Sequence, residues 1–157
     1  MPTVLIALDH SDASQAAALA AAELFGPHAT YLAINVADAP FDESAFVYGY
    51  AFPTVIPTMD DRPMSERVFE TVTRAREEAA TMSAKAGVAA VPLGDMGDPA
   101  TAILSAATEY GVDVIVTGWH DRSWFRGLFD KPVADALVSK ANIPVLIVPT
   151  HADASRA

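Results

Sequence analysis

The chain alternates between short, continuous apolar runs and longer amphipathic stretches. Runs of this length without interleaved polar residues are typical of strands buried on both faces of a parallel sheet. We predict five such strands, at residues 3–8, 30–36, 88–93, 114–117 and 145–148. The stretches between them carry apolar residues every three or four positions, as amphipathic helices do. A strand, a helix and a strand in succession form a parallel crossover unit, so the pattern predicts an α/β fold, an open parallel sheet with helices on both faces.

Capping residues mark the ends of the predicted helices. Ser11 is a credible N-cap for a first helix that ends at Gly26. One apolar stripe recurs through 65–86, after which Gly87 provides a left-handed cap. Asp98, followed by proline, is the predicted N-cap of a third helix. The residues of that helix expected to face the core are Ile103, Leu104, Ala107 and Tyr110. A short fourth helix is predicted before the last strand.

Prolines interrupt the pattern in two places. Pro92 lies inside the run 88–93 and cannot donate a sheet hydrogen bond, so we expect that strand at a sheet edge. Between residues 37 and 64 periodicity disappears altogether in a long insertion with several prolines. Connections this long are usually lids, binding loops or disordered segments. The insertion also contains the aromatic residues Phe41, Phe46, Tyr48, Tyr50 and Phe52. A lid or partner contact and simple packing onto the domain are both open interpretations.

Composition narrows the class of protein. At 157 residues the chain is most simply one domain over 1–150, with a polar tail at 151–157. It has no cysteine, which excludes disulfides and thiolate metal sites. Its formal charge of -10 disfavours nucleic acid as a partner. No apolar run approaches the roughly 20 residues that a membrane crossing needs. No secretory signal follows Met1, so we expect a cytoplasmic protein with neither a nucleic-acid nor a membrane partner.

Three segments together resemble a known family. They are ALDHSDASQAA at 7–17, GDPATAILSAATEYGVDVIVTG at 97–118, and GWHDRSWFRGLFDKPV at 118–133, followed by KANIPVLIVP. In sequence and spacing they closely resemble the universal stress protein family, and the similarity spans most of the chain apart from the insertion at 37–64. The resemblance implies an adenine nucleotide alpha hydrolase-like fold with the sheet order 3-2-1-4-5.

The resemblance also implies a homodimer and a nucleotide pocket. The dimer would pair the last strands, Val145 to Val148, and an unpaired apolar edge strand is otherwise an aggregation hazard. Many members bind ATP between strands one and four, at the carboxyl ends where open α/β sheets bind ligands. Asp9 would then contact the ribose or a metal, and Ala7 and Val36 would frame the adenine. The phosphates would lie on a glycine motif that includes Gly118 and the loop glycine Gly127.

This motif departs from the pattern of ATP-binding members. Gly118 keeps its first position, but Asp121, Lys131 and Pro132 occupy positions where the family motif has two glycines and a hydroxyl residue. Asp121 would repel phosphate, and Pro132 offers neither a hydroxyl nor an N–H group. Losing two charge-assisted donors costs about 1.5–3 kcal/mol each, which Lys131 alone cannot readily offset. The pocket therefore resembles the branch of the family that does not bind ATP, although ATP or AMP in a rearranged pose stays possible.

Other chemistries near these residues are less well supported. Asp9, His10 and Asp12 are too close in sequence to converge on a metal from one strand end, so we predict no metal site. We expect Asp9 to bond with neighbouring loop amides instead. His120 has no nucleophile or carboxylate at a catalytic spacing, so we predict no catalytic residue. The aromatic residues Trp119, Trp124, Phe125 and Phe129 form either a stacking platform or a packing or subunit contact.

Three functional hypotheses follow. The first is a non-enzymatic cytoplasmic stress-response protein that acts through contacts with an unidentified protein partner and needs no cofactor. The second is an ATP- or AMP-binding regulatory switch, with at most slow ATP hydrolysis, in which nucleotide orders the insertion at 37–64. The third is a small-molecule sensor that uses the aromatic loop.

Overall fold

The structure is a computed structural model and describes residues 1–39, 62–119 and 133–150. Most of the insertion predicted at 37–64 lies outside these residues, as does the tail at 151–157. The segment 120–132 also lies outside them, with His120, Asp121, Gly127, Lys131 and Pro132. The described strands form one parallel five-stranded sheet in the order β3-β2-β1-β4-β5, which confirms the predicted order and fold class. The strands are β1 (Thr3–Ala7), β2 (Thr30–Ala37), β3 (Ala90–Met96), β4 (Val114–Trp119) and β5 (Val145–Pro149).

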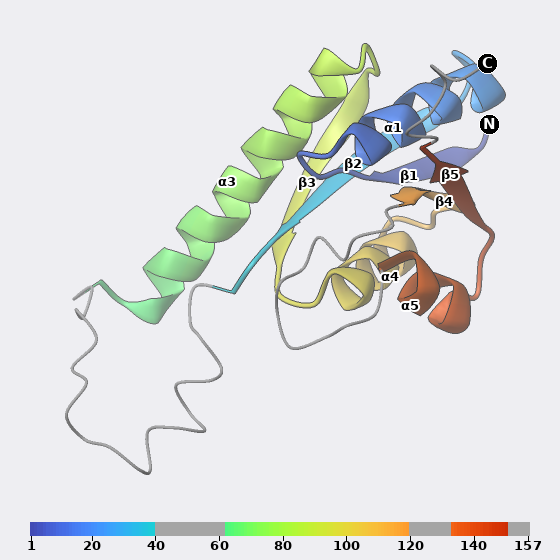
Figure 1. The fold of residues 1–157 in the computed structure, drawn as a ribbon. Helices are drawn as coiled ribbons and strands as arrows, with labels where there is room; N and C mark the ends of the chain where they lie inside the picture. The colour runs from blue at the N-terminus through green and yellow to red at the C-terminus, as the bar shows by residue number, and fades with distance from the viewer. Residues whose placement is uncertain (40–61, 120–132, 151–157) are drawn as a thin grey trace.

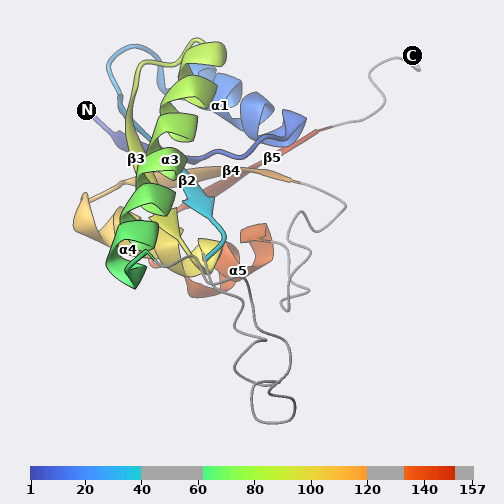
Figure 2. The same ribbon diagram turned by 90° about the vertical axis from the view of Figure 1, so that its left-hand side faces the viewer.

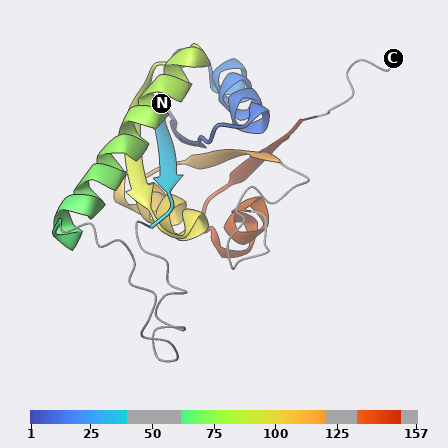
Figure 3. The same cartoon turned by 60° about the vertical axis from the view of Figure 1, so that its left-hand side comes forward.

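Helices cover both faces of the sheet, as predicted. The helices are α1 (Asp12–Phe25), α3 (Met64–Lys85), α4 (Pro99–Glu109) and α5 (Val133–Lys140). α1 and α3 lie on one face, and α4 and α5 lie on the other (Figures 1 and 2). β5 lies at the sheet edge remote from α3, whereas α3 packs along β3 at the opposite edge (Figure 3). Within the described residues, no helix is both long and apolar enough to cross a bilayer.

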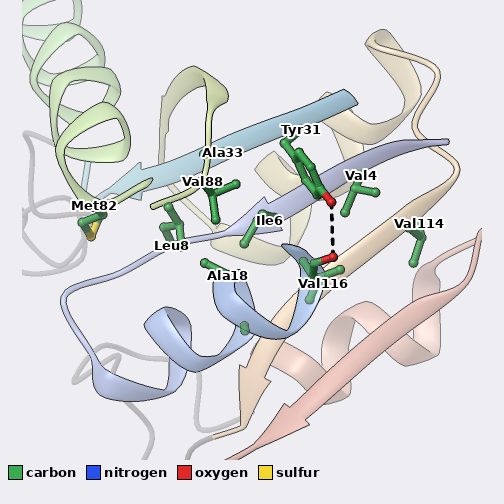
Figure 4. Packing of buried hydrophobic residues seen from close by; sticks show 12 residues of the cluster. Val4, Ile6, Leu8, Ala18, Tyr31, Ala33, Met82, Val88, Val114 and Val116 are labelled. Atoms are coloured by element: carbon green, nitrogen blue, oxygen red, sulfur yellow. Dashed lines mark hydrogen bonds between the residues drawn. The ribbon is translucent and has the colours of Figure 1, made fainter. Parts of the chain in front are cut away.

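The alternation of side chains along the strands produces two cores. In β1, Val4 and Ile6 point to the α1/α3 face, and Leu5 points to the α4/α5 face. Side chains of α1, α3 and the strands pack together on the first face (Figure 4). The largest fully buried side chains on the second face include Ile115 and Leu137. Burial of both strand faces is what a continuous apolar run predicts.

Local capping explains where α1 begins and ends. Ser11 is its N-cap and accepts a hydrogen bond from the Ser14 N–H at 3.2 Å, as predicted. Gly26 ends the helix with φ 67°, a conformation that favours glycine. The buried Tyr31 hydroxyl donates to the Gly26 carbonyl at 2.7 Å. It also reaches the Ala21 carbonyl at 3.3 Å, the contact drawn as a dashed line in Figure 4. Burial raises the pKa of this phenol above its ordinary value.

Two predicted strands have boundaries that differ from the observed ones by two or three residues. β3 begins at Ala90, not Val88, because the Val88 N–H donates to the Ser83 carbonyl at 2.9 Å and so completes the end of α3. The strand also runs on to Met96, but it does lie at the sheet edge and contains Pro92. β4 likewise continues beyond Thr117, so that Gly118 lies within the strand.

The predicted core face of α4 is correct except at one residue. Ile103 and Ala107 are buried and Leu104 packs against the same core, but Tyr110 is 46% exposed. The helix ends at Glu109, and Tyr110 is the C-cap, with a backbone that has already left the helix. Because the helix ends one residue before Tyr110, helical spacing does not turn this side chain toward the core.

Candidate functional site

The turn between β1 and α1 is organised around Asp9. One carboxylate oxygen, Oδ1, accepts a hydrogen bond from the Ser11 N–H at 2.8 Å and another from the Ser11 hydroxyl. The Ser14 hydroxyl donates to the Asp9 carbonyl at 2.7 Å. Bonding of Asp9 to a neighbouring loop amide is the arrangement that the sequence predicts. The carboxylate is partly exposed at the carboxyl end of β1, held in place by residues of its own turn.

The turn is also tied to β2 through a residue that sequence reasoning missed. The buried Asn35 side chain donates from Nδ2 to the Leu8 carbonyl at 3.0 Å, and the Leu8 N–H donates to the Ile34 carbonyl at 2.8 Å. Both backbone groups of Leu8 are therefore satisfied by β2. A polar amide within the otherwise apolar run 30–36 is the signal that could have identified Asn35, since a buried amide needs a partner.

Gly118 is constrained by close packing. A Cβ atom at this position would lie 2.5 Å from the backbone carbon and oxygen of Ala13 in the first turn of α1. Distances below 3.0 Å are essentially never seen for real Cβ atoms, so only glycine fits without a movement of α1. Sequence reasoning assigned this glycine to phosphate binding, but in the structure the approach of a helix to β4 is sufficient reason for it.

The predicted adenine residues lie on the opposite face. Val36 is buried in the α4/α5 core and Ala7 packs against that core. Asp9 and the first turn of α1 lie toward the α1/α3 face. The described candidates therefore share the carboxyl edge of the sheet, with Ala7 and Val36 on the α4/α5 side and Asp9 on the α1/α3 side, while Gly127 and Lys131 lie outside the described residues.

α4 also begins at this edge of the sheet. Asp98 is its N-cap and accepts from the Thr101 N–H at 2.9 Å and from the Thr101 hydroxyl at 2.6 Å. These hydrogen bonds lower the pKa of the Asp98 carboxyl, and the charge of Lys140 adds to the effect. The cap and the following proline confirm the predicted start of this helix.

A charged cleft opens between the β1–α1 turn and α3. We call it the turn–α3 cleft, and its volume is about 430 Å³. Its walls meet where the His10 ring nitrogen Nε2 lies 3.3 Å from the Glu78 carboxylate. Among the described residues, no three His, Asp or Glu side chains are grouped so that they could hold a metal ion. The cleft is lined by Asp9, His10, Asp12, Gln15, Arg74, Glu77, Glu78, Thr81, Met82 and Lys85.

Comparison with known families identifies the chain. The profile described as "Universal stress protein family" matches residues 1–149. The chain belongs to the universal stress protein family. The stress response protein NhaX of Bacillus subtilis (strain 168) is 42% identical over 52 residues, which are 33% of this chain and 31% of NhaX. The match thus spans less than a third of that curated relative's length.

Solved structures of similar proteins share the fold. The protein MJ0577 has a TM-score of 0.62 at 19% identity, with 96% of each chain covered. A universal stress protein in complex with cAMP has a TM-score of 0.56 at 22% identity, covering 96% of this chain and 98% of the other. A family member from Arabidopsis thaliana with AMP bound has a TM-score of 0.57 at 16% identity, covering 100% of this chain and 97% of the other.

Proposed function

We propose that this chain is a non-enzymatic, cytoplasmic universal stress protein that acts through protein contacts as a homodimer, with a nucleotide pocket that does not hold a triphosphate. The observation that carries the loss of triphosphate binding is the sequence after β4. Asp121 and Pro132 stand where the family's phosphate motif has a glycine and a hydroxyl residue. A carboxylate near phosphate oxygens is repulsive, and proline offers no donor.

The preformed turn at the end of β1 supports a regulatory role over a catalytic one. Asp9 already bonds to Ser11 through one oxygen, and Leu8 is held by Asn35. A general base needs a substrate proton within hydrogen-bond reach and is often oriented by a second group. Among the described residues around this turn, the hydroxyls of Ser11 and Ser14 are bonded to Asp9 itself. The arrangement is suited to holding a ligand.

A second candidate function is a regulatory switch that binds adenine nucleotide, with at most slow ATP hydrolysis. Two structures of similar proteins contain cAMP and AMP. Each of these ligands carries a single phosphate, so it needs none of the contacts that the β- and γ-phosphates of ATP require. Asp121 and Pro132, which replace the glycine and the hydroxyl residue of the family motif, would then weaken the binding of ATP more than the binding of AMP.

Calorimetric titration of the purified protein distinguishes these functions. We expect no saturable binding of ATP with magnesium, and no adenine nucleotide released when the purified protein is denatured. The triple variant Asp121→Gly, Lys131→Gly and Pro132→Ser should gain ATP binding. AMP binding that is lost in Asp9→Ala would establish the second candidate. Tight ATP binding by the unmodified protein would contradict the loss of triphosphate binding and would favour the second candidate.

The homodimer rests on the chemistry of the β5 edge. Val145, Leu146, Ile147 and Val148 are each only partly buried, and no described strand pairs with the outer side of β5. Pairing of two such strands about a twofold axis would protect both edges. In sedimentation, Ile147→Lys should yield monomer or insoluble protein. The matched change Val91→Lys, at an exposed position of the other edge strand, should leave the dimer intact. An unchanged profile for Ile147→Lys would rule out this interface.

A further inference from the structure

We propose that the turn–α3 cleft is a second binding site, specific for compact zwitterions such as α-amino acids and betaines. It shares Asp9 with the predicted nucleotide pocket, but Ala7, Val36 and Gly118 are not among its lining residues. Its volume of about 430 Å³ is within the range typical of small-molecule sites. The side chains proposed to hold the zwitterion, Arg74, Glu77 and Lys85, all lie on α3 and are not residues of the predicted nucleotide pocket.

Two regular elements build the walls. On α3, the lining residues recur at helical spacing, so they share one face of the last three turns. On the other side, Asp12 and Gln15 lie three residues apart in the first turn of α1. Met82, only 6% exposed, adds an apolar surface between the polar walls. The cleft thus has fixed polar walls and an apolar contact for a methyl or methylene group.

The charges in the cleft fall into two sets. Asp9 is engaged by Ser11, and Glu78 is paired with His10. By contrast, no described residue makes a hydrogen bond or ion pair with the side chains of Arg74, Glu77 or Lys85. Asp12, in the first turn of α1, is likewise without such a partner among the residues described. Two cations and two carboxylates are therefore available to a ligand in one cleft.

This charge pattern selects the ligand. A simple anion would be attracted by Arg74 but would meet several carboxylates, and a simple cation would meet Arg74 and Lys85. A zwitterion places each end against the opposite sign. Arg74 and Glu77 are three residues apart on α3, so their side chains are neighbours on one face of the helix. A compact zwitterion lying across this pair would have its carboxylate beside Arg74 and its ammonium group beside Glu77. Because these side chains are exposed, we expect weak and salt-sensitive binding.

Titration of the labelled protein with glycine and with betaine, followed by amide NMR, tests this site. We expect saturable shifts at Gln15, Thr81, Met82 and Lys85. Arg74→Gln should weaken binding about tenfold or more, as the loss of a charge-assisted contact does. Arg76→Gln is the matched control, since it removes the same charge from an exposed position on α3 outside the cleft. That variant should bind both ligands as the unmodified protein does.

Half-ligands complete the test. Acetate and methylammonium each supply one charge, and each should bind at least about tenfold more weakly than glycine. Equal binding of acetate and glycine would overturn the proposal, because the carboxylates of the cleft would then play no part. Absence of saturable shifts with both zwitterions would overturn it as well. Equal weakening by Arg74→Gln and Arg76→Gln would show a general charge effect and would equally contradict a site in the cleft.

Discussion

α1 and α5 attach to opposite faces of the same sheet in different ways. α1 has 14 residues, and its buried positions are Ala13, Ser14, Ala17, Ala18 and Ala21. None of these side chains is large, so the helix approaches the sheet closely and its backbone meets Gly118. α5 has only 8 residues and buries Ala134 and Leu137. α1 is thus positioned by close approach of its backbone to the sheet, and α5 is positioned by one large side chain. Atoms added beneath α1 should therefore disrupt its packing, whereas atoms removed from Leu137 should disrupt the packing of α5.

The largest effect is expected from removing the anchor of α5. Leu137→Ala should lower the free energy of unfolding by about 3 kcal/mol, because Leu137 is fully buried and such truncations leave a cavity. The matched change Val138→Ala, at a neighbouring side chain that is 57% exposed, should alter stability by less than about 0.5 kcal/mol. Chemical denaturation measures both. Equal losses for the two variants would mean that α5 is not anchored through Leu137.

The second effect is expected from adding atoms beneath α1. Gly118→Ala should lower the free energy of unfolding by about 2 kcal/mol, since its Cβ would meet the Ala13 backbone and force α1 to move. The double variant that also carries Ala13→Gly should remain destabilised, because the backbone atoms at 2.5 Å are the obstacle. Full recovery of stability in the double variant would show that the side chain of Ala13 is the relevant contact.

The comparison also explains what the sequence could predict. Continuous apolar runs identified all the described strands, and Ser11 and Gly26 fixed the ends of α1, because these signals depend on neighbouring residues alone. The strand order came from family resemblance, since pairing between distant strands leaves no local signal. The start of β3 was missed because the Val88 N–H is used by α3, a contact that the apolar pattern does not encode.

The candidate site was less predictable than the fold. The role of Asp9 followed from its place at a strand end, where a carboxylate commonly bonds to loop amides. The packing role of Gly118 depends on how closely α1 approaches β4, which the sequence does not state. The turn–α3 cleft forms only where α3 packs beside the β1–α1 turn, and its contacting residues His10 and Glu78 are 68 positions apart in the chain. Such long-range geometry cannot be read from spacing.

The third effect is a dependence of stability on acid pH, and it arises at the N-cap of α4, on the α4/α5 face of the sheet. Asp98→Ala should cost about 1 kcal/mol at neutral pH through loss of the α4 N-cap. Because the folded-state pKa of Asp98 is lowered, its contribution is present above the ordinary value of 3.8 and is lost as pH falls through the lower folded value. The difference between the variant and the unmodified protein should therefore narrow in acid. Thr101→Val should return the pKa of Asp98 toward 3.8, as NMR titration would show.

The smallest effect on stability is expected at Tyr31 on the α1/α3 face, and it depends on alkaline pH. Tyr31→Phe should lower the free energy of unfolding by about 0.5–1 kcal/mol below pH 9, since it removes the hydroxyl that bonds to the carbonyls at the end of α1. Burial raises the pKa of this phenol in the folded state, so its stabilising effect is complete below the ordinary value of 10.0 and is lost as pH rises through the folded value. The unmodified protein should thus lose stability more steeply above pH 10 than Tyr31→Phe does. Parallel pH profiles for the two proteins would mean that the Tyr31 phenol ionises as readily in the folded chain as in the unfolded one.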